Sequence, residues 1–247
     1  MARRTTIRSF ALGSAFMLSG MIAAAINAAD PVAVQSAEQQ LENGRSSLDE
    51  ATLLAARNAF EQCLRQTQNE RCAYDLANAE SYLAQAKQLH KDNKGAEHWL
   101  NLAIDDSKHA TAMSDGSSNA HALLADLYGR KIGFGGMLAG MRYGPKANAE
   151  AQRALALDAN NPRVYTVLGR KYLYAPKMFG GDLQKAIESF QKASSLDPHF
   201  DEAFVWLAIA YRKAGKEQQA QSALAEALRL NPQSAIAKDL QSGAKLQ

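Results

Sequence analysis

Two consecutive segments in the C-terminal part of this 247-residue chain repeat one another, and this repetition constrains the fold more than any other feature. Pro162 to Pro198 and Phe200 to Pro232 both place apolar residues, small and large, at the spacings of two successive helices. The small residues allow the two helices to approach closely, and the final proline ends the second helix where a turn must follow. Self-similarity at a fixed period predicts a stack of helix-turn-helix units.

These positions resemble the tetratricopeptide repeat (TPR), a helix-turn-helix of about 34 residues. The second segment keeps every position of that pattern, with Phe204, Leu207, Ala208, Tyr211, Gly215, Ala220, Leu224, Ala227 and Pro232. The first repeats it with Tyr165, Leu168, Gly169, Tyr172, Ala186, Phe190, Ala193 and Pro198. The resemblance implies an all-α fold, a right-handed superhelical stack of TPR-like repeats. It also implies a binding scaffold, but it names no partner.

Composition supports helices throughout and argues against nucleic acid as a partner. The chain has 47% hydrophobic residues and only 6 prolines, which suits one helical array with a sizeable core. Three of its 28 basic residues lie in the first 29 residues, which contain no acidic residue. The remainder is balanced, with 25 basic and 25 acidic side chains, so no overall positive charge remains to attract a phosphate backbone.

Residues 1–28 have the layout of a secretory signal peptide. Three arginines precede an apolar stretch from Phe10 to Ile26, and small residues follow, with cleavage expected after Ala28 or Ala25. The alternative is a retained anchor, because about 17 apolar residues is the short end of the spanning range. We expect an exported protein, periplasmic in a Gram-negative cell, with an inner-membrane protein anchored by the uncleaved segment as the alternative. Membrane contact is expected only through this segment.

The rest of the chain divides into four parts. We predict a flexible lead at 29–45, N-terminal helical pairs of degenerate repeats at 46–117, three TPR-like repeats at 118–232 (118–159, 162–198 and 201–232), and a capping helix and tail at 233–247.

Cys63 and Cys72 are the only cysteines, and eight residues separate them. In an exported protein such a pair is expected to form a disulfide that ties the end of one helix to the start of the next. Two free buried thiols, or a metal site that lacks further nearby ligands, remain as alternatives.

Two insertions interrupt the repeat spacing. Relative to the last repeat, 129–145 contains ten extra residues and 174–182 five, both in the turn inside a repeat. They should therefore project side by side from one edge of the stack. Their glycines, methionines and aromatic residues suit an adaptable apolar pocket, with Phe134, Met137, Met141, Met178 and Phe179 as candidate lining residues. The alternative is that the two loops simply cover each other and the helix ends.

No catalytic site is expected. Gly133, Gly135 and Gly136 fail the phosphate-binding pattern because Leu138 replaces its last glycine and no strand precedes them. Asp105 and His109 lie one helical turn apart without a third ligand nearby. We therefore predict no cofactor, no metal and no enzyme activity.

In TPR arrays the first helix of each repeat lines the concave surface. The residues that the repeat phase directs there are Arg130, Arg163, Arg170, Tyr174, Trp206, Arg212 and Lys213. Cations beside exposed aromatic rings would suit an acidic or C-terminal peptide, while a merely solvated charged groove is the alternative. We predict a non-catalytic TPR scaffold for protein or peptide interaction in the cell envelope. The alternative function is a transporter-associated accessory protein that binds a small molecule or lipid in the pocket of the two insertions.

Overall fold

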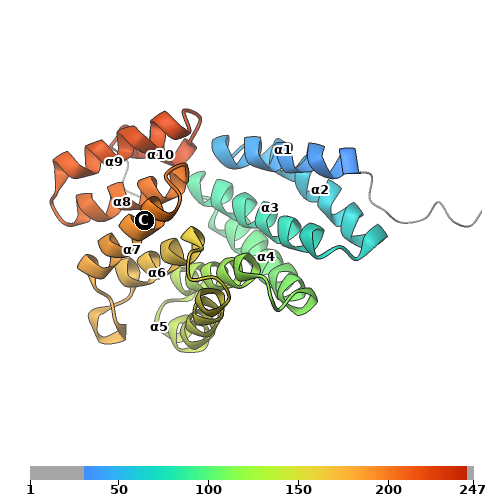
Figure 1. Ribbon diagram of the computed structural model, residues 1–247, viewed down its shortest axis with the longest axis horizontal. Helices are drawn as coiled ribbons and strands as arrows, with labels where there is room; N and C mark the ends of the chain where they lie inside the picture. The colour runs from blue at the N-terminus through green and yellow to red at the C-terminus, as the bar shows by residue number, and fades with distance from the viewer. Residues whose placement is uncertain (1–30, 244–247) are drawn as a thin grey trace, which may run out of the picture.

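The computed structural model describes residues 31–243, so the predicted signal peptide at 1–28 lies outside the described residues. The elements are α1 (Pro31–Ser47), α2 (Glu50–Thr67), α3 (Glu70–Leu89), α4 (Asn93–Met113), α5 (Ser118–Leu157), α6 (Pro162–Tyr174), the short 3-10 helix η1 (Lys177–Phe179), α7 (Leu183–Leu196), α8 (Asp201–Lys213), α9 (Glu217–Leu230) and α10 (Ala235–Gln241). Each helix packs mainly on its neighbours in the chain (Figure 1). The all-α prediction is confirmed. Within 31–243, no helix has the length and apolar character that crossing a membrane requires.

The structure has a helix where the sequence predicted a flexible lead. α1 occupies most of 29–45 because Ala37 and Leu41, one helical turn apart, are buried in the N-terminal core. The next helix begins at a defined cap, since the side chain of Asp49 accepts a hydrogen bond from the backbone N–H of Thr52. The predicted lead is therefore part of the folded array.

α3 is the central helix of the N-terminal half. Thirteen of its 20 residues are buried, and it packs against α1, α2, α4 and α5. Its many alanines allow these four helices to approach it closely. In Figure 1, α3 crosses the molecule between α1 and α2 above and α4 below.

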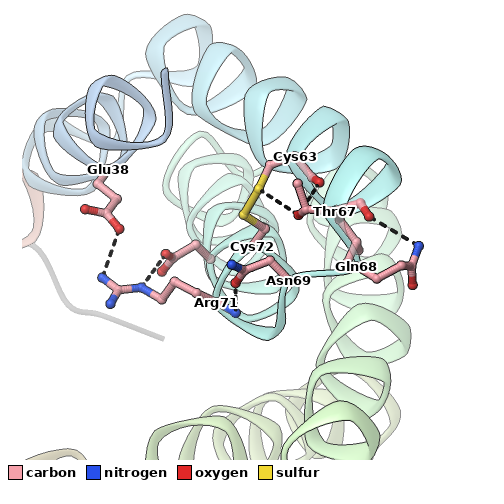
Figure 2. Close-up of a disulfide and its surroundings, with 9 residues drawn as sticks. Glu38, Cys63, Thr67, Gln68, Asn69, Arg71 and Cys72 are labelled. Carbon is pink, nitrogen blue, oxygen red and sulfur yellow. Dashed lines mark hydrogen bonds and ion pairs between the residues drawn. A yellow bond between two sulfur atoms is a disulfide. The ribbon is translucent and has the colours of Figure 1, made fainter. Parts of the chain in front are cut away.

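A disulfide joins Cys63 of α2 to Cys72 of α3, as the sequence predicted, with 6.0 Å between the two Cα atoms. Figure 2 shows the bond at the turn between the two helices, where Gln68 adopts a left-handed backbone conformation. Nearby, Arg71 pairs with Glu38 of α1 at 3.1 Å and with Asp75 at 2.8 Å. The start of α3 is thereby held to both α2 and α1.

α5 is a helical hairpin whose two arms reverse direction at Gly136. The ring of Tyr128 stacks on that of Tyr143 at 5.7 Å, and His121 lies 2.6 Å from Glu150, so the arms run antiparallel. Gly136 has φ 60° and ψ −143°, a conformation that glycine adopts far more readily than other residues. The insertion at 129–145 was predicted to be a flexible turn, but it lengthens both helical arms instead.

The last two pairs, α6 with α7 and α8 with α9, form the predicted C-terminal repeats. Asn161 caps α6, and Pro162 follows at the start of the helix, where its missing N–H costs nothing. The second insertion contains η1 between α6 and α7. α10 closes the array by burying Ala237 and Leu240.

The two ends of the array meet. Arg45 of α1 forms an ion pair with Asp201 of α8 at 3.1 Å. Asn231, which follows α9, donates hydrogen bonds to Asp201 at 2.7 Å and to Ser46 at 3.2 Å. Ile236 of α10 packs on both the N-terminal and the C-terminal core. Figure 1 shows α10 beside the C-terminal end of α1. The stack therefore closes on itself instead of ending in two free faces.

Candidate functional site

Closure of the array leaves a polar cleft between the N-terminal helices and α6. Its volume is about 500 Å³. Its walls come from α1, α3, the end of α4, the start of α5 with the segment before it, and α6. The lining residues include Glu38, Glu42, Arg45, Tyr74, Asp75, Asn78, Tyr82, Ala110, Ser117, Asn119 and Arg163.

A smaller cavity of about 50 Å³ continues this cleft into the concave side of the C-terminal repeats. The two spaces share five lining residues, namely Tyr74, Asn78, Tyr82, Asn119 and Arg163. The smaller cavity adds Ser81 and Gln85 of α3, Asp126 and Arg130 of α5, Thr166 and Arg170 of α6, and Phe200 and Glu202 around the start of α8. One continuous site therefore runs along α3, with the C-terminal repeats on its other side.

Arg163 lies where the two cavities join. Its guanidinium carbon is 5.5 Å from the centre of the Phe200 ring. Among the described residues, Arg163 forms no ion pair with a carboxylate, unlike Arg45, Arg71 and Arg170. The field of Tyr74, opposed by burial, raises the pKa of Arg163 above its ordinary value, so this side chain stays charged. Arg163 also interacts with the side chains of Tyr82 and Glu202, so the cleft contains a cation that forms no ion pair with a described carboxylate but is not free of contacts.

Two other predicted arginines also line the smaller cavity but are engaged within the protein. Arg130 donates hydrogen bonds to the hydroxyl of Ser81 at 2.8 Å and to its carbonyl oxygen at 3.1 Å. Arg170 pairs with Asp126, and its guanidinium carbon lies 4.5 Å from the centre of the Trp206 ring. The structure therefore brings Arg130, Arg163 and Arg170 together, and their role in binding a partner stays a prediction.

The other four predicted residues do not line either cavity. Trp206 was expected to be exposed, but only 8% of it is, because its ring stacks on Phe190 within the C-terminal core. Tyr174 is half exposed and contacts the edge of Trp206. Arg212 donates to the carbonyl oxygen of Leu240 at 3.3 Å, and Lys213 donates to that of Leu173 at 2.9 Å. Both cations fix local structure here.

Sequence reasoning missed the wall that α3 contributes. Tyr74, Asn78, Ser81 and Gln85 follow one another at helical spacing, so they form a polar stripe on a helix that is otherwise rich in alanine and leucine. A polar stripe on a buried helix is the signal that could have located this wall, since such groups need partners or a water-filled space.

Two buried carboxyl groups lie on the same helix. Glu80 is fully buried; its Oε1 accepts a hydrogen bond from Nε of Arg57 at 3.1 Å, while its Oε2 has no partner among the described residues. Burial and the negative charge of Asp106 raise the pKa of Glu80 to about 8. Burial also raises the pKa of Asp75, although its ion pair with Arg71 opposes the change. α3 therefore contains acids that remain protonated at higher pH than usual.

The candidate pocket residues of the insertions lie outside the two cavities described above. Phe134 packs toward α4 with Tyr143, whereas Met137, Met141, Met178 and Phe179 are exposed. Neither part of the cleft includes any of these five residues. The ligand pocket of the two insertions therefore stays a prediction. In the part of the chain that the structure describes, no three His, Cys, Asp or Glu side chains gather as metal ligands would.

Solved structures with a similar arrangement of helices include a TPR protein and a haemophore. The thermophilic TPR protein TTC0263 of Thermus thermophilus matches with a TM-score of 0.60 and 18% sequence identity, over 84% of this chain and 97% of that chain. The HusA haemophore of Porphyromonas gingivalis matches with a TM-score of 0.54 and 18% identity, over 80% and 92%. At these identities the likeness shows the fold alone, which is TPR-like.

No curated protein matches this sequence. A family model does: the one described as Regulator of microtubule dynamics protein 1-3 matches residues 33–246. This range includes all of the helices from α2 to α10 and most of α1. Because the match spans far more than half of the chain, the protein belongs to the RMD1-3 family, Regulator of microtubule dynamics protein 1-3.

Proposed function

We propose that the protein is a non-catalytic scaffold that binds a peptide segment of a protein partner in the polar cleft along α3. The TPR-like fold and the family support a protein-binding role. The observation that carries the proposal is the position of Arg163, a cation without a carboxylate ion pair in the described residues, where a cleft of about 500 Å³ joins the smaller cavity.

The chemistry of the cleft favours a peptide with an acidic side chain or a free C-terminal carboxylate at Arg163. A carboxylate there would gain charge-assisted hydrogen bonds from the guanidinium. Asn78, Asn119 and Tyr74 line the same space, and side chains of these types can form hydrogen bonds with a peptide backbone. The particular partner is not encoded in these residues.

The test uses peptide libraries with a free C-terminal carboxylate, matched to libraries with a C-terminal amide. Fluorescence anisotropy with the full chain should show tighter binding of acidic peptides or of the free-acid form. Arg163→Gln keeps hydrogen-bond donors but removes the charge, and we expect it to weaken this binding about tenfold, or about 1.4 kcal/mol. Arg65→Gln, an exposed position on α2 outside the cleft, is the matched control. Equal binding by Arg163→Gln and the control would contradict the proposal.

The proposed scaffold acts outside the cytoplasm, in the cell envelope. The charged and then apolar layout of residues 1–28 supports this location, and so does the disulfide, since such bonds persist in oxidising compartments. Cell fractionation of the full chain tests it. Recovery of the protein in the cytoplasmic fraction with both thiols reduced would contradict the location and leave the cleft proposal untouched.

A further inference from the structure

The exposed apolar side chains of the described residues gather in the two insertions. Seven large apolar side chains are largely exposed, and six of them lie in these segments: Met137, Leu138, Met141, Tyr174, Met178 and Phe179. Met137, Leu138 and Met178 are 72%, 78% and 83% exposed. Exposed apolar groups that cluster in this way mark an interaction surface more often than scattered ones do.

The first group lies at the far end of the α5 hairpin. Met137 and Leu138 directly follow the reversal at Gly136, and Met141 is one turn further on. Ten extra residues relative to the last repeat add about five residues to each arm, which extends the hairpin by about 7 Å at 1.5 Å per residue. We call residues 136–142 the hairpin tip. Its exposed side chains line neither of the two cavities described above.

The second group lies at the same end of the array. Lys171 of α6 donates a hydrogen bond to Asn148 of α5 at 2.7 Å, so the second arm of α5 lies beside α6. α6 begins just after α5 ends and runs back along it, so residues before Asn148 and after Lys171 extend toward the same side. η1 follows Lys171 within one or two turns. In Figure 1 both α5 and the connection from α6 to α7 reach the lower part of the view.

The charges around both groups have one sign. Residues 127–149 contain four basic and no acidic side chains, and 171–181 contains Lys171 and Lys177 without an acid. Arg142, Lys146 and Lys177 are exposed, whereas Lys131 is paired with Glu97. From residue 30 onward the whole chain is balanced, with 25 basic and 25 acidic residues. The excess of positive charge at this end is therefore local.

We propose that the hairpin tip and η1 together dock on the surface of an anionic phospholipid bilayer. Apolar side chains at such a surface enter the boundary between headgroups and acyl chains, and neighbouring Lys and Arg residues contact the phosphates. Two separate groups of exposed side chains with flexible methionines fit a soft, flat surface better than a single concave pocket of a protein. Residues 1–28 are the one membrane contact expected from the sequence, and this surface would be a second one. None of its residues lines the peptide cleft, so the two sites are independent.

The first experiment measures whether a side chain at the hairpin tip enters the bilayer, so that membrane binding through residues 1–28 alone does not give the same result. Leu138→Trp in the full chain places an indole at the tip, and Ala225→Trp places one on the exposed face of α9 as a matched control. Vesicles of phosphatidylcholine with brominated phosphatidylglycerol should quench the fluorescence of Leu138→Trp and shift it to the blue. Ala225→Trp should keep the signal of the parent protein, which has Trp99 and Trp206. Equal responses of the two variants, or none, would overturn the proposal.

The second experiment tests the chemistry. Using the Leu138→Trp signal, Arg142→Glu with Lys146→Glu should weaken binding to phosphatidylglycerol vesicles at least tenfold, and pure phosphatidylcholine should bind weakly. The control, Lys94→Glu with Lys192→Glu, makes the same charge change at exposed positions away from the tip and should alter binding less than twofold. Gel filtration without vesicles tests self-association. If the parent protein forms a dimer and the double variant Met137→Ser with Leu138→Ser does not, the surface mediates self-association and the proposal is overturned.

Discussion

Gly169 on α6 faces the ring of Phe190 on α7, and this contact tests whether the two helices pack as closely as the structure has them. A Cβ atom at Gly169 would lie 2.5 Å from Cε1, 2.7 Å from Cδ1 and 2.8 Å from Cζ of Phe190. The ring is fully buried and stacks on Trp206, with 6.2 Å between centroids, so it has no free space to enter. In Gly169→Ala the helices must separate or the ring must leave its preferred position.

The expected cost follows from two opposing terms. Overpacking of a filled core costs about 1–3 kcal/mol, and three ring atoms closer than 3 Å place this case near the upper end. Replacing glycine by alanine inside a helix returns about 1 kcal/mol. We expect Gly169→Ala to lower the free energy of unfolding by about 2 kcal/mol, and the melting temperature by about 4–8 °C for a chain of this size.

Urea denaturation followed by circular dichroism measures the change, with Gly129→Ala as the matched control. Gly129 is also inside a helix, but a Cβ there meets nothing within 4 Å, so this variant should be more stable by about 0.5–1 kcal/mol. Phe190→Leu removes part of the ring, so in the double variant Gly169→Ala should cost less than it does alone. If Gly169→Ala is as stable as the parent protein, the close packing of α6 on α7 is wrong.

Three further changes test other contacts. Because the pKa of Glu80 is raised to about 8, above its unfolded value of 4.5, the folded state binds this proton more tightly, and its contribution to stability is lost as pH rises from about 4.5 to 8. The free energy of unfolding should therefore fall by up to about 1.4 kcal/mol per pH unit in that window, and urea titrations at pH 5 to 8 should show a smaller fall in Glu80→Gln. The double variant Cys63→Ala with Cys72→Ala should have a free energy of unfolding about 2–3 kcal/mol lower, because the short loop that the disulfide closes no longer restricts the unfolded chain. Thermal unfolding with and without reductant checks this. No difference from the parent under oxidising conditions would count against the bond. Asp201→Ala should lower the free energy of unfolding by about 2–3 kcal/mol, because it leaves Arg45 and Asn231 without their partner. Asp105→Ala, in the exposed pair with Lys108, should lower it by less than 1 kcal/mol. Equal effects of the two variants would argue against the contact between the two ends of the array.

The parts of the fold that the sequence predicts are those with local periodicity. The C-terminal repeats, the cysteine pair at a turn and the inward direction of Arg163 and Arg170 all follow from spacing within one or two helices. The glycines of 129–145 indicated a loop, yet the segment is helical because Phe134 and Tyr143 pack toward α4. Tertiary packing there outweighs the low helix propensity of glycine.

The closure of the array could not be predicted in this way. The contact between Arg45 and Asp201 joins residues 156 positions apart, and no repeating pattern connects them. For the same reason the cleft was expected to be a groove lined by the C-terminal repeats alone, whereas most of its wall comes from α1 and α3. A long-range pairing of two polar side chains leaves no periodic signal in the sequence.

Closure also separates the structural role of the cleft's charges from their proposed binding role. Arg45, Arg130 and Arg170 each hold one helix to another, through Asp201, Ser81 and Asp126. Substituting any of them should change stability and peptide binding together, because the walls of the cleft would move. Arg163 forms no ion pair with a described carboxylate, although it interacts with Tyr82, Glu202 and the ring of Phe200, so we expect Arg163→Gln to disturb the walls less than the other three substitutions. Loss of peptide binding in Arg163→Gln at unchanged melting temperature would therefore be specific to the cleft, whereas the same loss in Arg170→Gln would not.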